Sequence, residues 1–286
     1  MISSVKSEKV KYIIRLQQKA RFRKKEGLFV CEGARLVKEA PLSQLVQVFV
    51  TQEAATSAEL SGWLKEVSAA GVFVETVSEE VCRRMSEVVH SQGVVAVVRM
   101  PESGEGLFGA EDLRGTGISG SNLAEDLRGS NVPLLVFLEN LQDPGNMGTI
   151  LRTAEAAGAT GVAALGNCVD LSSPKVVRST MGSIFRLPHR AYPDGGEALR
   201  AARQAGICLY GAMLSEDSVP YEEADFTRSC AVLIGNEGAG LSQEAAALCD
   251  AKISIPMQGK VESLNAGMAA GILLFEAARQ RRRPEK

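Results

Sequence analysis

The residues best suited to chemistry gather in the C-terminal half of the chain, at points where strands are expected to end. Glu139 opens the first stretch, Asp143-Pro144-Gly145 marks a turn, and Asn146 can cap the helix that starts beside it. Arg152 follows between apolar neighbours, so its guanidinium need not face bulk solvent, although a salt bridge to Glu139 or Glu155 is the structural alternative. Amide, carboxylate and guanidinium groups at the carboxyl ends of strands predict a site that holds its ligand by hydrogen bonds and charge.

The second stretch is Leu233-Ile-Gly-Asn-Glu-Gly-Ala-Gly-Leu-Ser242. We expect it to run from a strand through a glycine turn to a helix capped by Ser242. Its glycines would let a ligand approach the backbone closely. Their order, G-x-x-G-x-G, matches neither a Walker A loop nor the dinucleotide fingerprint, which leaves a nicotinamide dehydrogenase as a weak alternative.

The third stretch runs from residue 253 to Asn265 and leads into a long apolar helix. Ser263 and Asn265 are polar groups at the start of this helix, where they need hydrogen-bond partners. The apolar side of the helix, from Met268 to Phe275, is interpreted as core.

Alternating helices and strands must position these residues. From residue 132 onward, apolar strands predict a mostly parallel sheet covered on both faces. The expected domains are a smaller α/β domain at 1–102, a glycine-rich linker with a near-duplicated string at 103–131, and a larger domain at 132–286. The expected strands of the larger domain are 134–138, 161–165, 207–210, 231–234 and 253–255. Its expected helices are 147–157, 174–180, 197–205, 243–248 and 264–281, and we expect an extended segment at 184–187.

The composition excludes several classes of protein. With 286 residues, 45% hydrophobic and 23% charged, the chain is an ordinary globular protein with no apolar run long enough to span a membrane. Six widely spaced cysteines without a C-x-x-C motif predict reduced thiols in a cytoplasmic protein. Only two histidines are available, so we expect no metal site and no histidine-based triad.

Charge is distributed unevenly along the chain. Residues 1–25 hold nine basic side chains and one acidic one, whereas the net charge of the whole chain is −2. A basic segment on an acidic body predicts binding of a polyanion such as nucleic acid, and a solvated helix face is the alternative. The candidate residues for this binding are Lys19, Arg21, Arg23, Lys24 and, further along the chain, Arg35.

In order and spacing, the three stretches together resemble the motifs of the SpoU/TrmH branch of the SPOUT RNA methyltransferases. The matching strings are Asn146-x-Gly148-x-x-x-Arg152, Gly235-Asn-Glu-Gly-x-Gly-Leu-Ser242, and Ile255-Pro-Met-x-Gly259 followed by Ser263-Leu-Asn265. Lys175-Val-Val-Arg-Ser-Thr-Met-Gly182 also looks like the family, and segments 29–37 and 91–97 are similar to its L30e-like substrate-binding domain. One departure is Ala266-Gly267-Met268, where the family usually has Val-Ser-Val.

The resemblance implies an α/β SPOUT fold with a C-terminal trefoil knot, a homodimer with composite sites, and S-adenosylmethionine-dependent methylation of a ribose 2′-hydroxyl of RNA. It implies cofactor contacts from Gly235, Ile255, Met257 and Leu264, and an active site of Asn146, Arg152, Glu237, Ser263 and Asn265. Arg152 stays protonated, so it would clamp an RNA phosphate and polarise the hydroxyl rather than act as a free base.

The L30e-like domain favours rRNA, and 23S rRNA in particular, as the substrate. A tRNA ribose methyltransferase, a drug-resistance enzyme on the same architecture, and a non-catalytic RNA-binding or assembly factor are the alternatives. An intact set of active-site residues argues against the non-catalytic alternative.

Overall fold

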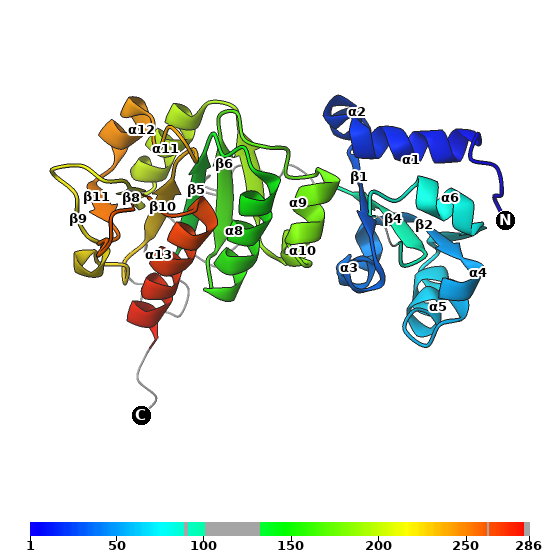
Figure 1. Ribbon diagram of the computed structural model, residues 1–286. Helices are drawn as coiled ribbons and strands as arrows, with labels where there is room; N and C mark the ends of the chain where they lie inside the picture. Colours follow the sequence, from blue (N-terminus) through cyan, green and yellow to red (C-terminus); the bar gives the residue numbers. More distant parts are fainter. Residues whose placement is uncertain (89–90, 101–131, 262, 283–286) are drawn as a thin grey trace. The chain divides into compact units, whose positions relative to one another are not determined.

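The computed structural model describes residues 1–88, 91–100, 132–261 and 263–282 (Figure 1). The described residues form two compact units: the first holds residues 1–100 and Asp170–Phe185, and the second holds 132–169 and 186–282. By its contacts, the segment Asp170–Phe185, which comes from inside the expected C-terminal domain, packs with the first unit. The expected linker, 103–131, lies outside the described residues.

The first unit is built on a four-stranded sheet in the order β1-β4-β2-β3, in which only β2 and β3 pair in parallel. Its strands are β1 (Leu28–Glu32), β2 (Leu45–Thr51), β3 (Phe73–Val77) and β4 (Val94–Arg99). Alternate side chains of a strand point to opposite faces. Val94, Ala96 and Val98 accordingly join the core on one face, and Val95 and Val97 join the core on the other.

Helices cover both faces of this sheet. They are α1 (Glu8–Gln18), α2 (Ala20–Glu26), α3 (Ala34–Glu39), α4 (Gln52–Thr56), α5 (Ser61–Ala69), α6 (Glu79–Arg84), α9 (Pro174–Ser179) and α10 (Ser183–Arg186). Val10, Ile13 and Leu16 of α1 are buried in one of the cores, so the basic N-terminal segment is part of the folded unit. A helical turn, α10, replaces the extended segment expected at 184–187, because it places Ile184 in the other core.

The second unit is built on a seven-stranded sheet in the order β7-β6-β5-β10-β8-β11-β9, in which all pairs are parallel. Its strands are β5 (Leu134–Glu139), β6 (Gly161–Leu165), β7 (His189–Tyr192), β8 (Cys208–Ala212), β9 (Val219–Pro220), β10 (Cys230–Ile234) and β11 (Ala251–Ser254). The expected parallel α/β sheet is confirmed. β7 and β9 are additions at its edges, where strands of four and two residues leave little pattern in the sequence.

Four helices cover the two faces of the parallel sheet. They are α8 (Pro144–Ala156), α11 (Gly195–Gln204), α12 (Gln243–Leu248) and α13 (Ala266–Arg281). α8 and α13 pack side by side on one face, while α11 and α12 share a core with Leu135, Phe137 and Leu233 on the other (Figure 1). Among the described residues, no helix has the length and apolarity needed to cross a membrane.

The closing helix α13 differs from its expected packing. Ala270, Leu273 and Leu274 are fully buried, as the expected core requires, but Met268 is 62% exposed and Phe275 is 49% exposed. The interpretation of the whole apolar side as core is therefore wrong, and one strip of this side faces away from the rest of the unit.

Candidate active site

A cavity of about 410 Å³ lies beyond the carboxyl ends of β8, β10 and β11. All four expected cofactor-binding residues, Gly235, Ile255, Met257 and Leu264, line this one cavity, although they come from two separate loops. Its volume is in the range of pockets for small ligands, and most of its remaining lining is apolar or backbone. A nucleoside cofactor therefore fits the residues present, with an apolar surface for its base and backbone groups at the strand ends.

The glycines of the second stretch close a tight turn beside this cavity. The backbone groups of Asn236 and Gly240 exchange two hydrogen bonds of 3.0 and 2.9 Å, and the Asn236 Oδ1 accepts from the backbone N–H groups of Gly238 and Ala239. A Cβ at Gly235 would lie 2.2 Å from the carbonyl carbon of Gly240. Any side chain at Gly235 would therefore push the turn open, which explains the glycine order physically.

Glu237 lies at the centre of a hydrogen-bond network that joins the three sequence stretches. Its Oε1 accepts from the Asn146 Nδ2 at 3.1 Å and from the Asp143 backbone N–H at 3.0 Å, and its Oε2 accepts from the Gln142 backbone N–H at 3.2 Å. The Asn146 Oδ1 in turn accepts from the Asn265 Nδ2 at 2.8 Å. Asn146, Glu237 and Asn265, which lie far apart in the sequence, therefore form one connected polar group.

The hydrogen bonds keep the Glu237 side chain ionised. Burial alone would raise the pKa of this carboxyl, but the hydrogen bonds from Asp143, Asn146 and Gln142 lower it below its ordinary value. A carboxylate with a low pKa and several fixed donors is a poor general base. The geometry assigns Glu237 to orienting Asn146 and to placing a negative charge at the wall of the cavity, which it also lines.

The residue that caps α8 is not the expected one. Asp143, not Asn146, caps α8, because its side chain accepts from the Asn146 backbone N–H, and this leaves the Asn146 amide free for the network. Asn265 caps α13 through its Oδ1, which accepts from the backbone N–H groups of Gly267 and Met268. Ser263 is exposed, lines the cavity and has no hydrogen-bond partner among the described residues.

Arg152 stands apart from both the network and the cavity. It is exposed on α8 and forms no hydrogen bond or ion pair with any described residue. Glu139 is occupied by Ser242, whose backbone N–H and Oγ each donate at 2.7 Å, and Glu155 pairs with Arg186. The structural alternative, a salt bridge to either glutamate, is therefore wrong, and the guanidinium is available to a ligand.

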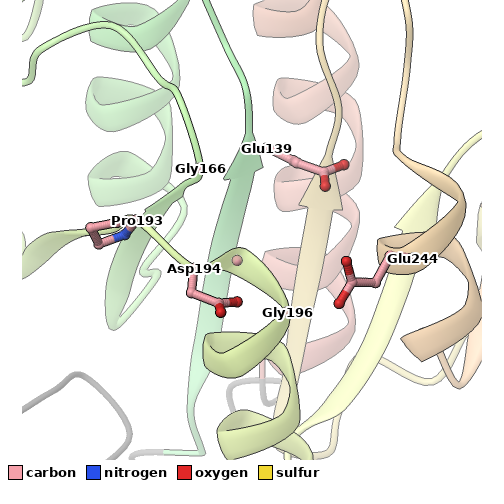
Figure 2. A pocket seen from close by; sticks show the side chains of 7 residues that line it. Glu139, Gly166, Pro193, Asp194, Gly196 and Glu244 are labelled. Carbon is pink, nitrogen blue, oxygen red and sulfur yellow. The ribbon is translucent and has the colours of Figure 1, made fainter.

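A second hollow of about 460 Å³ lies on the other side of the Glu139–Ser242 contact (Figure 2). Figure 2 shows Glu139, Asp194 and Glu244 around it, at the end of β5 and at the starts of α11 and α12. Like charges repel, so three carboxylates disfavour an RNA phosphate here. None of the expected site residues lines this hollow.

The expected RNA-binding residues divide into exposed and buried groups. Lys19, Arg21, Lys24 and Arg35 are exposed. Arg23 is only 4% exposed: its guanidinium donates to the carbonyls of Leu16 and Gln17 at 2.7 and 2.6 Å and pairs with Asp170 at 2.5 Å. The assignment of Arg23 to RNA binding is corrected, because its buried guanidinium is paired with Asp170 and hydrogen-bonded to two backbone carbonyls inside the first unit.

Sequence reasoning missed Asn140, which follows β5. Its φ of +52° lies in the left-handed region, where asparagine is tolerated better than most residues. Its Oδ1 accepts from the Asn167 backbone N–H at 2.9 Å, and its carbonyl accepts from the Asn236 Nδ2 at 2.9 Å. Asn140 therefore joins the ends of β5 and β6 to the turn beside the cavity, and the only sequence signal was an asparagine directly after a strand.

Comparison with known proteins agrees with this geometry over both units. The sequence matches the SpoU rRNA Methylase family over residues 133–275 and the MRM3-like substrate binding domain over residues 7–96. A 23S rRNA (uridine(2479)-2′-O)-methyltransferase of Streptomyces viridochromogenes is 38% identical over 236 residues, which are 78% of this chain and 73% of that protein. The 23S rRNA (guanosine(2553)-2′-O)-methyltransferase RlmP of Bacillus subtilis is 31% identical over 96% of this chain and 97% of its own length.

Solved structures lead to the same family. The SpoU methyltransferase AviRb from Streptomyces viridochromogenes, in complex with the cofactor AdoMet, is 32% identical with a TM-score of 0.78, over 96% of this chain and 99% of that one. An AdoMet-bound rRNA methyltransferase from Sinorhizobium meliloti has the same TM-score at 30% identity, over 97% of both chains. Since the motifs, the parallel sheet and the cavity all agree with these matches, the chain belongs to the SpoU rRNA methylase family.

Proposed function

We propose that this protein transfers a methyl group from S-adenosylmethionine to a ribose 2′-hydroxyl of 23S rRNA. The observation that carries the proposal is the single cavity lined by Gly235, Ile255, Met257 and Leu264, with the Asn146–Glu237–Asn265 network at its wall. S-adenosylmethionine supplies an activated methyl group on a positively charged sulfonium. The ionised carboxylate of Glu237 lines the cavity, so it complements that charge.

Arg152 is the residue that we assign to the RNA. A guanidinium stays protonated at neutral pH, so it serves as a charge and a donor and not as a base. Because Arg152 is exposed and has no partner among the described residues, it can bind a phosphate in two hydrogen bonds and polarise the reacting 2′-hydroxyl. Holding the two reactants in line accounts for a large share of the rate in such a transfer.

The first unit is proposed to hold the rRNA. Lys19, Arg21, Lys24 and Arg35 are exposed there, and contacts of lysine and arginine with phosphates provide affinity that does not depend on sequence. A tRNA (guanosine(18)-2′-O)-methyltransferase of Thermus thermophilus is 40% identical but matches only 56% of this chain, whereas the 23S rRNA enzymes match 78% and 96%. The presence of the first unit therefore favours rRNA over the tRNA alternative.

We propose a homodimer formed through α13, with the knot expected for the family in each subunit. Met268 and Phe275 lie along one strip of this helix and are 62% and 49% exposed, and Leu264, which precedes the helix, is 38% exposed. An exposed apolar strip of this kind is typical of an interface. α8, which carries Arg152, packs beside α13, so a second copy on this strip would come close to the arginine.

A Met268→Glu variant should be monomeric by light scattering; a dimer at unchanged affinity would contradict the interface.

The proposed site of action is the cytoplasm. All six cysteines are free thiols, which fits a reducing compartment that also contains ribosomal RNA.

Two experiments test the proposal. Calorimetric titration with S-adenosylmethionine should show one site per chain, and Gly235→Ala should abolish it; absence of heat in the wild type would favour the non-catalytic alternative. Mapping 2′-O-methyl groups in total RNA from cells with and without the gene should then reveal one missing site in 23S rRNA. A missing site in tRNA, with 23S rRNA unchanged, would transfer the proposal to the tRNA alternative.

A further inference from the structure

One family-like motif has no place in the proposed reaction. It lies in residues 170–185, which we call the strap, and which comprise α9 and most of α10. In the sequence, the residues on both sides of the strap belong to the second unit, but the strap itself belongs to the first. The chain therefore connects the two units three times: through 101–131, between Val169 and Asp170, and between Phe185 and Arg186.

The strap completes the apolar core of the first unit. Val177 is fully buried and Ile184 is 4% exposed, in the same core as Phe29 and Val94. The ring of Phe185 stacks on Phe29, with a centroid distance of 6.0 Å and an interplanar angle of 24°. A change in the strap would therefore expose apolar surface of the RNA-holding unit.

Two ion pairs fix the strap at separate points. Near its start, Asp170 binds the buried Arg23 at 2.5 Å, and in α9 Arg178 binds Glu32 at 2.6 Å. Glu32 is 7% exposed and also accepts from the Ser86 Oγ at 2.6 Å. In each pair one member is buried, Arg23 in the first and Glu32 in the second, so a shift of its partner would leave a buried charge unpaired.

The residue preceding the strap is bound to the start of the first catalytic stretch. In the second unit, the Val169 backbone N–H donates to the Leu141 carbonyl at 2.8 Å, and the Asn167 backbone N–H donates to the Asn140 Oδ1 at 2.9 Å. These contacts stand directly before the turn that leads into α8. The residue before the strap is thus hydrogen-bonded to Leu141, which directly precedes Gln142 and Asp143, and the backbone N–H groups of these two residues donate to Glu237.

The residue that follows the strap, Arg186, is bound to α8. Arg186 pairs with Glu155 of α8, with the Arg186 Nη2 and the Glu155 Oε2 3.1 Å apart. Glu155 lies three residues, just under one helical turn, beyond Arg152. The two residues of the second unit that flank the strap, Val169 and Arg186, are therefore bound to the β5–α8 segment that carries Asn146 and Arg152.

We propose that the strap is a positioning element that sets where RNA held by the first unit presents its ribose to Arg152. The inference rests on the proposed function and adds a role for Arg178 and Glu32, which touch neither substrate nor cofactor. A reaction that depends on orientation is sensitive to small displacements: about 1 Å can cost about 100-fold in rate. Loosening the strap should therefore lower the rate of methyl transfer more than it lowers the affinity for either reactant.

The decisive experiment lengthens the strap without removing any contact. Gly-Ser-Gly-Ser is inserted between Val169 and Asp170, and the matched control carries the same insertion between Gly115 and Thr116, in the connection through 101–131. With a 23S rRNA transcript at saturation, we expect the single-turnover rate to fall at least 10-fold in the strap variant and less than 2-fold in the control. Affinities for S-adenosylmethionine and for the transcript should stay within about 2-fold of the wild type in both.

A second pair of variants covers the case in which the insertion disturbs folding. Arg178→Gln should lower the single-turnover rate, Arg178→Lys should restore most of it, and Lys175→Gln, an exposed change on the same helix, should leave it unchanged. An unchanged rate in the strap insertion and in Arg178→Gln overturns the inference. So does a loss confined to RNA affinity or to thermal stability. Failure of the proposed function is a separate result, because the wild type itself would then not methylate the transcript.

Discussion

Arginines are used differently in the two units of this protein. In the first unit, Arg23 and Arg178 each face a carboxylate at 2.5 and 2.6 Å, and Arg23 is almost fully buried. In the second unit, Arg152 is exposed, unpaired among the described residues, and adjacent to a helix with exposed apolar side chains. A guanidinium satisfied inside the protein contributes to folding, whereas one left exposed and without a partner among the described residues is available to a ligand. The contrast predicts that similar substitutions will have opposite effects.

The largest effect is expected from Arg152→Ala. Loss of one charged donor from a transition state typically costs up to about 1,000-fold in rate. We expect a loss of this order in single-turnover methylation, with the melting temperature unchanged because the side chain is exposed. Arg152→Lys should retain the charge but lose the two-pronged geometry and recover only part of the rate. Near-normal methylation by Arg152→Ala would remove the arginine from the mechanism.

Arg23→Ala should show the opposite behaviour. The substitution removes the ion-pair partner of Asp170 and the hydrogen bonds to two backbone carbonyls. We therefore expect the free energy of unfolding to fall by about 3 kcal/mol. Denaturant unfolding of the first unit measures this loss. Cofactor affinity should be unchanged, and Arg21→Ala, an exposed neighbour, is the control for stability. A folded Arg23→Ala protein with wild-type stability but weak RNA binding would return Arg23 to the RNA-binding residues.

Asn146→Ala should weaken the network that joins the three stretches. The variant removes one donor from Glu237 and the acceptor of Asn265. A hydrogen bond to a charged group contributes about 1.5–3 kcal/mol. Because Glu237 lines the cavity, we expect the loss of its Asn146 donor to lower cofactor affinity about 30-fold by calorimetry. Gln142→Ala, which retains the backbone donor to Glu237, should change this affinity far less.

The ion pair of Asp170 makes the stability of the first unit pH-dependent. Burial alone would raise the pKa of Asp170, but hydrogen bonds from Ser172 and the charge of Arg23 lower it below the ordinary value of 3.8. The ionised carboxylate therefore stabilises the folded state above about pH 4, and this contribution is lost as the pH falls through the folded pKa. Wild type and Asp170→Asn should differ most in stability near neutral pH and converge in acid. A constant difference from pH 7 to pH 3 would contradict the assignment.

The smallest effect concerns the exposed cations of the first unit. Replacing Lys19, Arg21 and Lys24 by glutamine should weaken RNA binding several-fold and reduce its logarithmic salt slope by about 2. The rate at saturating RNA should not change. This substitution tests the charge more cleanly than deletion of residues 1–25, since α1 also contributes Val10, Ile13 and Leu16 to a core. An unchanged salt slope would assign RNA binding to another surface.

Motif order predicted the cavity well because each motif is local. Gly235 must be glycine to let the turn close, and Asn265 must be polar to cap a helix, so both leave a signal in a few consecutive residues. The burial of Arg23 could not be predicted in the same way. Its partner, Asp170, lies 147 positions away in the sequence, and no local pattern distinguishes it from an exposed arginine in a basic helix.

The sequence by itself determined the alternation of strands and helices and the identity of the three stretches, because these depend on short-range periodicity and turn chemistry. The residues expected at the cavity followed from the resemblance of the ordered motifs to a known family. Only the tertiary structure decided which charges are satisfied internally, that Asp143 rather than Asn146 caps α8, and that residues 170–185 fold with the first unit. Those features depend on pairs of groups brought together across long stretches of chain. Such an interaction contributes free energy only after folding has brought both groups together and removed water from between them.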